Sequence, residues 1–317
     1  MGKARGAGKS SVDMTVRALE LFCGIGGFAA AVTGTEVEIV GALDQDPTAL
    51  GVYRLNFPSR DVRQQDLEKI SAAELAAFGA DLWWLSPPCQ PYCVRGARRD
   101  LDDPRARSLA RLLDVLAVLT ETELPRYLAL ENVTGFAGSQ AHKRLLTILH
   151  ARGFQVRERC LCPTELGVPS RRPRYYLAAS RGPLPPPPAP AAASRRLASY
   201  LEPASASCPL DRLLIPAHIL ERFGNGLRIL DPDDPGAYTT CFTASYGKSV
   251  MHSGSYLLYG NGVRYFAPEE VARLLHFPDN FHFPEGMSNR RKWHLLGNSL
   301  SIVAVHEVLS VFQGNTA

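Results

Sequence analysis

The chain carries, at residues 19–28, the segment Leu19-Glu20-Leu21-Phe22-Cys23-Gly24-Ile25-Gly26-Gly27-Phe28. Its apolar start is typical of a buried strand, and the glycines that follow predict a tight turn leading into a helix. Glycines let the backbone approach a ligand closely, and a helix N-terminus offers free N–H groups. One strand later, Leu43-Asp44 places a carboxylate at a strand end, where it could hold ribose hydroxyls. The glycine spacing differs from the dinucleotide pattern GxGxxG, which disfavours an oxidoreductase.

Strand-like and helix-like segments alternate from residue 17 to about residue 180. We expect strands at 17–22, 38–43, 82–85, 127–130, 155–160 and 174–179, and helices near 47–56, 71–78, 107–121 and 139–152. Alternation of this kind predicts βαβ units and a mostly parallel sheet with helices on both faces. The predicted fold class is therefore α/β.

A proline-rich connector at 183–190 ends this region, and residues 195–265 then show no clear periodicity. Helical patterning returns at 268–275 and again from residue 288 to the end. We therefore expect a large domain formed by residues 17–182 and 266–317, with a small domain, 183–265, inserted into it. Residues 1–16 are polar and basic, without the apolar core of a signal peptide, and are expected to form a disordered tail.

The bulk composition is that of an ordinary soluble globular protein, because 45% of the 317 residues are hydrophobic and 21% are charged. No apolar run approaches the roughly 20 residues of a membrane helix, so we expect no membrane partner. The seven cysteines form no CxxC pair and have no histidine at zinc spacing, so we expect free thiols and no metal. Of the 35 basic residues, 29 are arginine. Arginine binds phosphate and stacks on bases, although a compositional bias would explain the same excess.

A second informative segment is Leu85-Ser86-Pro87-Pro88-Cys89-Gln90-Pro91-Tyr92, which follows the strand-like run 81–85. Its prolines hold the loop in few conformations, because proline fixes its own φ and restricts the residue before it. A cysteine held so rigidly suggests a nucleophile. The alternative is a cysteine that only fills the core.

Three further segments carry groups suited to a site. Glu131 ends the apolar run 127–130, and it should meet Cys89 on one rim because the carboxyl ends of parallel strands share an edge. Arg171-Arg172-Pro173-Arg174 opens another strand, and Gly297-Asn298-Ser299 predicts a tight turn before the last helix. The alternative for Glu131 is a surface glutamate, and for the arginine segment a solvated run of charge. The alternative for Gly297-Asn298-Ser299 is a helix cap.

Taken together, five segments resemble, in this order, the motifs of the cytosine-C5 methyltransferases: Phe22-Cys23-Gly24-Ile25-Gly26-Gly27, Pro87-Pro88-Cys89-Gln90, Glu131-Asn132-Val133, Arg172-Pro173-Arg174 and Gly297-Asn298-Ser299. The resemblance covers about residues 17–182 and 265–312. It implies a Rossmann-like S-adenosylmethionine-dependent methyltransferase sheet with a small inserted target-recognition domain. It also implies that S-adenosylmethionine is held by Phe22, Gly24, Ile25, Gly26, Gly27, Asp44, Asp66, Pro87, Asn298 and Ser299.

The same resemblance implies that the catalytic residues are Cys89, Glu131, Arg172 and Arg174. Carbon 5 of cytosine is a poor nucleophile until a group adds at carbon 6, and a thiolate at Cys89 would add there. Glu131 would hydrogen-bond N3 and the amino group of the base. The two arginines would orient the pyrimidine carbonyl and lower the pKa of the Cys89 thiol. A base that the sequence does not identify would then remove the C5 proton.

Three segments are similar to the branch that methylates tRNA, the tRNA-Asp cytosine-38 C5-methyltransferases. They are 166–172, 239–247 and 265–270, and the second contains Cys241-Phe242-Thr243. The insert, about 185–265, is in addition short for reading a DNA sequence. A cytosine in an anticodon loop is unpaired and cheap to extrude. We expect substrate contacts from Gln90, Arg95, Cys241, Phe242 and Thr243, and phosphate contacts from Arg95, Arg98, Arg99, Arg105 and Arg107.

The sequence therefore favours a tRNA cytosine-C5 methyltransferase that acts on cytosine 38 of tRNA-Asp or a related tRNA. A DNA cytosine-C5 methyltransferase is the enzymatic alternative, with DNA otherwise a weak substrate, and a non-catalytic RNA-binding protein is the second. We expect a cytoplasmic monomer, also present in the nucleus if the chain is eukaryotic. Cys93 could form a disulfide with Cys89 on oxidation, and Cys241 is either a second thiol near the base or an ordinary buried cysteine.

Overall fold

A seven-stranded sheet forms the centre of the large domain in the computed structural model, which describes residues 15–93, 99–186, 195–202 and 210–315. The strand order is β3-β2-β1-β4-β5-β8-β6. The strands are β1 (Val16–Leu21), β2 (Val37–Asp44), β3 (Val62–Gln64), β4 (Leu82–Leu85), β5 (Tyr127–Val133), β6 (Gln155–Leu161) and β8 (Arg174–Ser180). Strand β8 runs antiparallel to both of its neighbours, and the other pairings are parallel. The predicted α/β fold with a mostly parallel sheet is confirmed.

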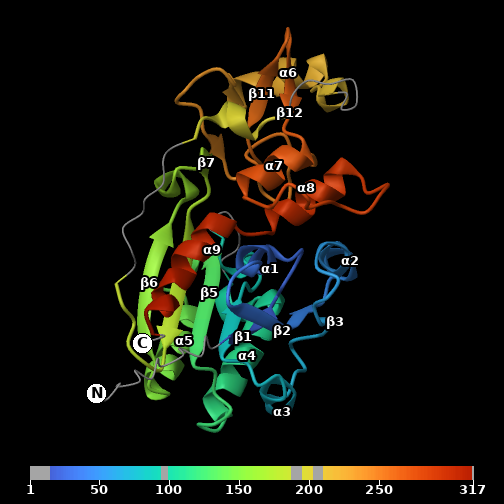
Figure 1. The fold of residues 1–317 in the computed structure, drawn as a ribbon. Helices are drawn as coiled ribbons and strands as arrows, with labels where there is room; N and C mark the ends of the chain where they lie inside the picture. Colours follow the sequence, from blue (N-terminus) through green and yellow to red (C-terminus); the bar gives the residue numbers. More distant parts are fainter. Residues whose placement is uncertain (1–14, 94–98, 187–194, 203–209, 316–317) are drawn as a thin grey trace, which may run out of the picture.

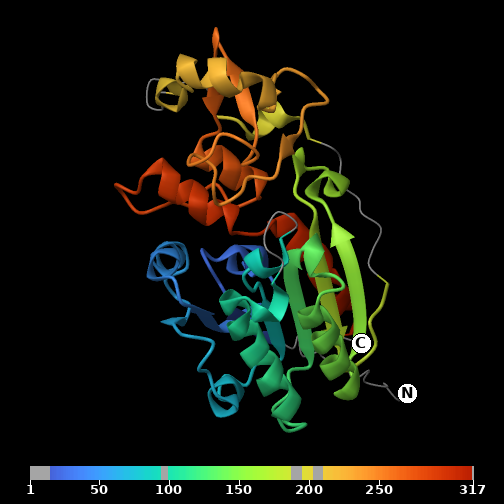
Figure 2. The same ribbon diagram turned by 180° about the vertical axis from the view of Figure 1, so that it is seen from behind.

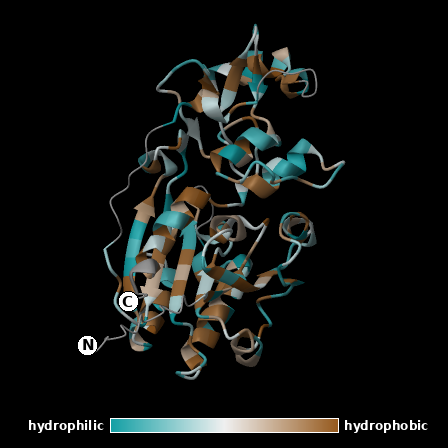
Figure 3. Ribbon diagram, viewed as in Figure 1, coloured by the Kyte–Doolittle hydropathy of each residue, from teal (hydrophilic) through white to brown (hydrophobic). Residues whose placement is uncertain are grey.

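Helices cover both faces of this sheet, as the alternation predicted (Figures 1 and 2). One hydrophobic cluster joins Ala18 and Trp84 of the sheet to helices α1 (Gly27–Val32), α2 (Pro47–Asn56) and α9 (Ile302–Leu309). A second cluster joins their neighbours Leu19 and Trp83 to helices α3 (Ala72–Ala76), α4 (Arg107–Val118) and α5 (Gln140–Ala151). Because side chains alternate along a strand, adjacent residues of β1 and β4 reach opposite layers. In Figure 3 the middle strands of the sheet are accordingly mostly brown.

A smaller body lies beyond the carboxyl edge of the sheet (Figure 1). It contains the three-stranded sheet β12-β11-β9, the two-stranded pair β10-β7, and three helices. These elements are β7 (Ser170–Arg171), α6 (Ala217–Phe223), β9 (Ile229–Leu230), β10 (Thr239–Thr240), β11 (Tyr256–Tyr259), β12 (Gly262–Tyr265), α7 (Pro268–Leu274) and α8 (Asn289–Gly297). The strand β3, the helix α6 and the short strands of the smaller body have no counterpart in the sequence prediction.

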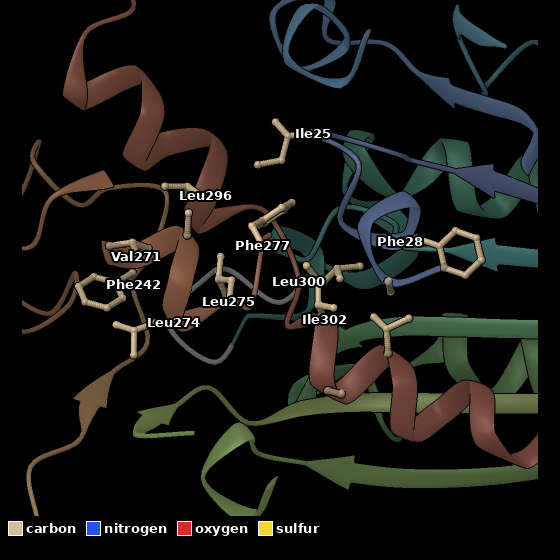
Figure 4. Close-up of a cluster of buried hydrophobic side chains, with 14 of the residues drawn as sticks. Ile25, Phe28, Phe242, Val271, Leu274, Leu275, Phe277, Leu296, Leu300 and Ile302 are labelled. Carbon is tan, nitrogen blue, oxygen red and sulfur yellow. The ribbon is translucent and has the colours of Figure 1, made fainter. Parts of the chain in front are cut away.

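Helices α7 and α8 pack with the smaller body, whereas α9 returns to the large sheet (Figure 1). Trp293 of α8 lies edge-on to Tyr246 at 5.2 Å between ring centroids and donates to the Phe266 carbonyl at 3.0 Å. The hydrophobic cluster is continuous from Phe242 and Leu296 to Ile302 on the sheet face (Figure 4). The two parts of the molecule therefore share one hydrophobic core. The division of the chain at residues 183 and 266 stays a prediction.

The C-terminal segment Asn289–Phe312 is long enough to cross a membrane, and an 18-residue window of it reaches a mean hydropathy of 1.6. It is not one straight helix, because a turn at residues 298–301 separates α8 from α9. Within the protein, 61% of that window is buried. We interpret its apolar side chains as part of the hydrophobic core. The segment has no unbroken apolar run of about 20 residues, so the sequence did not indicate a membrane helix there.

Candidate active site

A cavity of about 320 Å³ opens at the carboxyl edge of the large sheet, below the smaller body. The ends of β1, β2, β4 and β5 contribute to it, together with the start of β8 and the turn after α8. Thirteen of the residues predicted from the sequence line it: Phe22, Gly24, Ile25, Gly27, Asp44, Pro87, Cys89, Gln90, Glu131, Arg172, Arg174, Asn298 and Ser299. The antiparallel direction of β8 explains why its arginines reach the cavity. The first residue of β8, Arg174, pairs with Val133 at the carboxyl end of β5.

The loop that carries Cys89 is held by three hydrogen bonds to groups of the sheet. The Ser86 N–H donates to the Leu21 carbonyl at 3.2 Å, and the Trp84 indole donates to the Ser86 hydroxyl at 2.9 Å. The buried amide of Asn132 donates to the Pro87 carbonyl at 3.1 Å. With the two prolines, these contacts fix where the half-buried Cys89 sulfur points. Sequence reasoning did not foresee the role of Asn132.

Glu131 and Arg174 form an ion pair beside this thiol. The Arg174 Nε lies 3.3 Å from Glu131 Oε1, and both side chains are largely buried. Burial raises the pKa of the Glu131 carboxyl, and the positive charges of Arg174 and Arg172 oppose that rise. The carboxyl therefore binds a proton more readily than an exposed glutamate, which suits a group that must hydrogen-bond a ring nitrogen.

Arg172 is 4% exposed and bridges segments that are far apart in the sequence. It donates to Cys241 Sγ at 3.2 Å and to the Phe242 and Gly297 carbonyls, each at 3.2 Å, and it also contacts the Ser299 carbonyl. These donors are thus occupied by the protein itself. Arg172 positions the second thiol and the turn after α8, whereas the predicted contact with a pyrimidine carbonyl stays a prediction.

Cys241 lies between two guanidinium groups, since Arg174 also donates to its sulfur, at 3.5 Å. Burial alone would raise the pKa of the Cys241 thiol, but Arg172 and Arg174 bring it below its ordinary value. Phe242, expected to contact substrate, is instead a core residue that packs on Tyr246 and Phe266. Thr243 and Cys241 line a separate cavity of about 330 Å³ on the side of the smaller body.

The thiol of Cys89 behaves differently from the sequence prediction. A hydrogen bond with Cys93, followed by burial, raises the pKa of the Cys89 thiol, and Arg174 only partly opposes that rise. Arg174 does lower the pKa of this thiol, as the sequence predicted, but the larger effects of Cys93 and burial make the net shift upward. The sequence placed Glu131 and Cys93 near Cys89, but it did not show how deeply the thiol is buried or that Cys93 and burial outweigh the arginine.

The glycine turn and Asp44 form the opposite end of the cavity. The Asp44 carboxylate accepts the Gly24 N–H and the Asp46 N–H, each at 2.9 Å, which holds the turn after β1 against the end of β2. A side chain at Gly27 would meet Leu300 at 2.9 Å, so glycine is needed for α1 to approach the turn after α8. A carboxylate held in this way at the end of β2 suits the ribose of a nucleoside ligand.

Besides Cys241, Phe242 and Thr243, three further predicted residues are not among the described residues that line this cavity. Gly26 supports the turn in a left-handed conformation, with φ of 88°, but does not line the cavity. Asp66 follows β3 and pairs with Lys69 at 3.1 Å, outside the cavity lining. Arg95 lies outside the described residues. Other lining residues, which lie close in the chain to predicted ones, were missed by sequence reasoning: Glu20, Cys23, Gln45, Asp46, Ser86, Pro88, Leu295 and Leu300. Arg105 also lines the cavity, whereas the sequence analysis expected it only to contact phosphate.

Glu20 is notable among the missed residues because a strand interior rarely contains a buried acid. Its carboxylate is 2% exposed and accepts a hydrogen bond from the Tyr53 hydroxyl at 2.7 Å. Burial raises the pKa of Glu20 to about 8. The alternation Leu19-Glu20-Leu21 is the sequence feature that could have identified it. Across the described ranges, no cluster of His, Cys, Asp and Glu side chains is arranged to hold a metal ion.

Comparisons with known proteins show the family to which the chain belongs. The family described as C-5 cytosine-specific DNA methylase matches residues 16–203. The chain is 29% identical to the tRNA (cytosine(38)-C(5))-methyltransferase of Rattus norvegicus, over 93% of this chain and 98% of that protein. It is 28% identical to the DNA (cytosine-5)-methyltransferase of Dictyostelium discoideum, over 93% of this chain and 94% of that protein.

The fold is likewise similar to a solved methyltransferase structure. The Entamoeba histolytica methyltransferase EhMeth superposes with a TM-score of 0.86 at 26% identity, covering 95% of this chain and 98% of that one. The family match spans more than half of the chain and includes the loop that carries Cys89 and the strand that carries Glu131. The protein is therefore a member of the C-5 cytosine-specific DNA methylase family.

Proposed function

We propose that the protein transfers a methyl group from S-adenosylmethionine to carbon 5 of a cytosine in a tRNA anticodon loop. The proposed target is cytosine 38 of tRNA-Asp or a related tRNA. One observation carries this proposal: Cys89, Glu131 and Arg174 meet around a single cavity whose other end is the glycine turn with Asp44. A nucleophile, a buried carboxyl and a nucleoside-type pocket thus border the same cavity.

The residues at the glycine end suit S-adenosylmethionine. Asp44 offers carboxylate oxygens to ribose hydroxyls, and the turn from Phe22 to Gly27 brings backbone close to the ligand. Asn298 and Ser299 close the same wall, since Ser299 Oγ lies 3.2 Å from the place a Gly27 side chain would take. When bound there, S-adenosylmethionine supplies an electrophilic methyl group.

The chain's own residues would make the cytosine reactive. The Cys89 sulfur, after losing its proton, forms a bond to carbon 6, and the electron pair of the C5–C6 double bond moves onto carbon 5 and the ring. Glu131 hydrogen-bonds N3 and the amino group, and so stabilises that density, while Arg174 holds the Glu131 carboxyl in place. After carbon 5 is methylated, loss of its proton restores the double bond and the bond from Cys89 to carbon 6 breaks.

The choice of tRNA over DNA rests on chemistry and on similarity. The segment Cys241-Phe242-Thr243 resembles the tRNA-methylating branch, and the rat relative is named as a tRNA enzyme. An anticodon-loop cytosine is already unpaired, whereas a duplex cytosine must be extruded at a cost of about a few kcal/mol. A DNA methyltransferase remains the second candidate because the Dictyostelium relative carries that name.

A cationic pocket beside the active-site cavity supports an anionic polymer as substrate. It measures about 330 Å³ and is lined by Lys248, Arg290, Arg291 and His294, together with Ala244 and Ser288. His294 lies one turn before Asn298, a wall residue of the active-site cavity. Of the arginines predicted to bind phosphate, Arg99 and Arg107 are exposed, Arg105 pairs with Asp103, and Arg95 and Arg98 lie outside the described residues.

The test is methyl transfer from labelled S-adenosylmethionine to total tRNA and, in parallel, to duplex DNA. We compare the wild type with Cys89→Ala and with Cys160→Ala, an exposed cysteine on β6 that does not line the cavity. Label in tRNA that disappears only in Cys89→Ala supports the proposal. Label mainly in DNA would establish the second candidate, and label in neither would leave a binding protein.

A further inference from the structure

A second cavity lies in the smaller body, next to the arginines of the active site. It measures about 330 Å³, and Cys241 lines it. The sulfur of Cys241 accepts hydrogen bonds from Arg172 at 3.2 Å and from Arg174 at 3.5 Å, and both arginines line the active-site cavity. The walls of the two cavities are therefore in direct contact.

Arg228 is an exposed residue that lines the second cavity. Its guanidinium lies over the Tyr238 ring, 4.6 Å from the ring centroid, and donates a hydrogen bond to the Tyr238 carbonyl at 3.3 Å. These two contacts hold the side chain in place. Across the described ranges, Arg228 forms no ion pair and its guanidinium makes no second hydrogen bond. Most of its five N–H groups are therefore available to a ligand.

His252 lines the same cavity in a strained backbone conformation. Its φ is 60°, in the left-handed region that residues other than glycine rarely adopt. The neighbouring Ser253 is 1% exposed, and its carbonyl accepts the Thr243 N–H at 2.8 Å, which holds the backbone beside His252 in place. His252 is exposed, and its imidazole makes no hydrogen bond with the part of the chain that the structure describes. Strain of this kind persists where the surrounding structure enforces it, often at ligand sites.

Two hydroxyl groups of the second cavity are already paired within the protein. The Tyr256 hydroxyl donates to the Val250 carbonyl at 2.7 Å, and the Thr240 hydroxyl lies 3.1 Å from that of Ser255. No carboxylate is among the described residues that line the cavity, so it does not suit a cation. The guanidinium and the imidazole are thus the exposed lining groups that can stack on a ligand and donate to it.

A guanidinium and an imidazole are groups that proteins use to bind unpaired bases of RNA. Each has a flat face on which a base stacks, and N–H donors for the oxygen and nitrogen atoms of the base. The volume of the second cavity is close to the 320 Å³ of the active-site cavity, which leaves room for a base. Because the two cavities adjoin each other, a base in the second one would be close in the strand to the target cytosine.

We propose that the second cavity binds an unpaired base that lies close to the target cytosine in the substrate RNA, an inference that rests on the proposed function. The base stacks against Arg228 and His252, while the target cytosine enters the active-site cavity. Holding the two bases in separate cavities keeps the loop open around the target. It also selects the cytosine that reaches Cys89, because only a cytosine at the right spacing from the bound base can enter.

The experiment measures the binding of anticodon stem-loop RNAs by fluorescence anisotropy, at one salt concentration and without S-adenosylmethionine. One RNA has the complete anticodon loop of tRNA-Asp, and each of the others lacks one loop base but keeps its phosphate. The wild type is compared with the double variant Arg228→Gln with His252→Gly, because glycine suits the left-handed backbone. Arg290→Gln is the control, since it removes a charge from the cationic pocket instead. Thermal melting followed by circular dichroism establishes that the variants fold.

In the wild type, loss of one particular loop base should weaken binding about 10-fold, the size of one stacking contact. The double variant should bind the complete loop about 10-fold more weakly, and loss of the same base should then change nothing further. Arg290→Gln should weaken binding to every RNA alike, because phosphate contacts do not depend on the base. An equal effect of each missing base in the wild type and in the double variant would overturn the proposal.

Methyl transfer to the stem-loop, to total tRNA and to duplex DNA separates this inference from the proposed function. A wild type that methylates tRNA, but binds every loop base independently of Arg228 and His252, overturns the inference alone. A wild type that methylates duplex DNA, and neither binds the stem-loop nor methylates tRNA, refutes the proposed function and the inference with it.

Discussion

Gly297 provides the sharpest test of how the active site is assembled. It is the last residue of α8, and its carbonyl accepts a hydrogen bond from Arg172 at 3.2 Å. A Cβ added there would lie 2.3 Å from the Ala244 nitrogen and 2.4 Å from the Thr243 carbonyl carbon. These are backbone atoms of the segment that carries Cys241, so they cannot rotate out of the way. We predict that Gly297→Ala is destabilising.

One favourable and two unfavourable effects decide how much the free energy of unfolding changes. Alanine is favoured over glycine in a helix by about 1 kcal/mol. Against this, forcing an extra carbon into a packed site costs about 1–3 kcal/mol. Displacing the Gly297 carbonyl from the Arg172 guanidinium costs about 1.5–3 kcal/mol more. The steric and hydrogen-bonding costs together exceed the propensity gain, so the free energy of unfolding should fall by about 1.5–5 kcal/mol.

The assay is urea unfolding of Gly297→Ala beside Gly51→Ala. Gly51 lies within α2 and an added Cβ there would meet no atom within 4 Å, so only the propensity gain applies. We expect Gly51→Ala to raise the free energy of unfolding by about 0.5–1 kcal/mol. A Gly297→Ala variant as stable as the wild type would show that α8 can shift away from residues 243–244, and would refute the argument.

Three further predictions concern charge and oxidation. Arg290→Gln should reduce the slope of log tRNA affinity against log salt by about 0.7. The control Lys143→Gln, at an exposed residue of α5 outside this pocket, should leave the slope unchanged. Glu20 keeps its proton to about pH 8 when folded but loses it near 4.5 when unfolded, so wild-type stability should fall as pH rises between these values. The fall should reach about 1.4 kcal/mol per pH unit relative to Glu20→Gln, and parallel stability curves for the two proteins would contradict it. Mild peroxide should oxidise the Cys89 and Cys93 thiols to one disulfide, with two protons and two electrons reducing peroxide to water; peptide mass mapping without that linkage would reject this.

Local patterns in the chain were sufficient for most of the fold and for the residues at its strand ends. The strands at 82–85 and 174–179 and the helix at 47–56 agree closely with β4, β8 and α2. Periodicity and capping act over a few residues, so they can be recognised without knowing what lies across the core. For the same reason Cys89 and Glu131 were both placed on the carboxyl rim, because a parallel sheet brings its strand ends together.

The surroundings of each side chain required the tertiary structure. Phe242 was expected at the substrate and lies in the core, while Arg172 uses its donors on Cys241 and on backbone carbonyls. The pKa of the Cys89 thiol is raised and not lowered for the same reason, since the neighbour Cys93 and burial outweigh the effect of Arg174. Hydrogen-bond partners and desolvation depend on atoms that are distant in sequence, so a motif does not specify them.

The sequence alone determined the α/β class, the mostly parallel sheet, and the residue types that meet at its edge. These follow from short-range preferences and from the alternation of strands and helices. Only the tertiary structure decided that β8 runs antiparallel and carries Arg174 to the end of β5, and that Gly297 lets α8 touch the Cys241 segment. Strand direction and close backbone approach depend on packing across the whole chain, where contacts hundreds of residues apart compete for the same space.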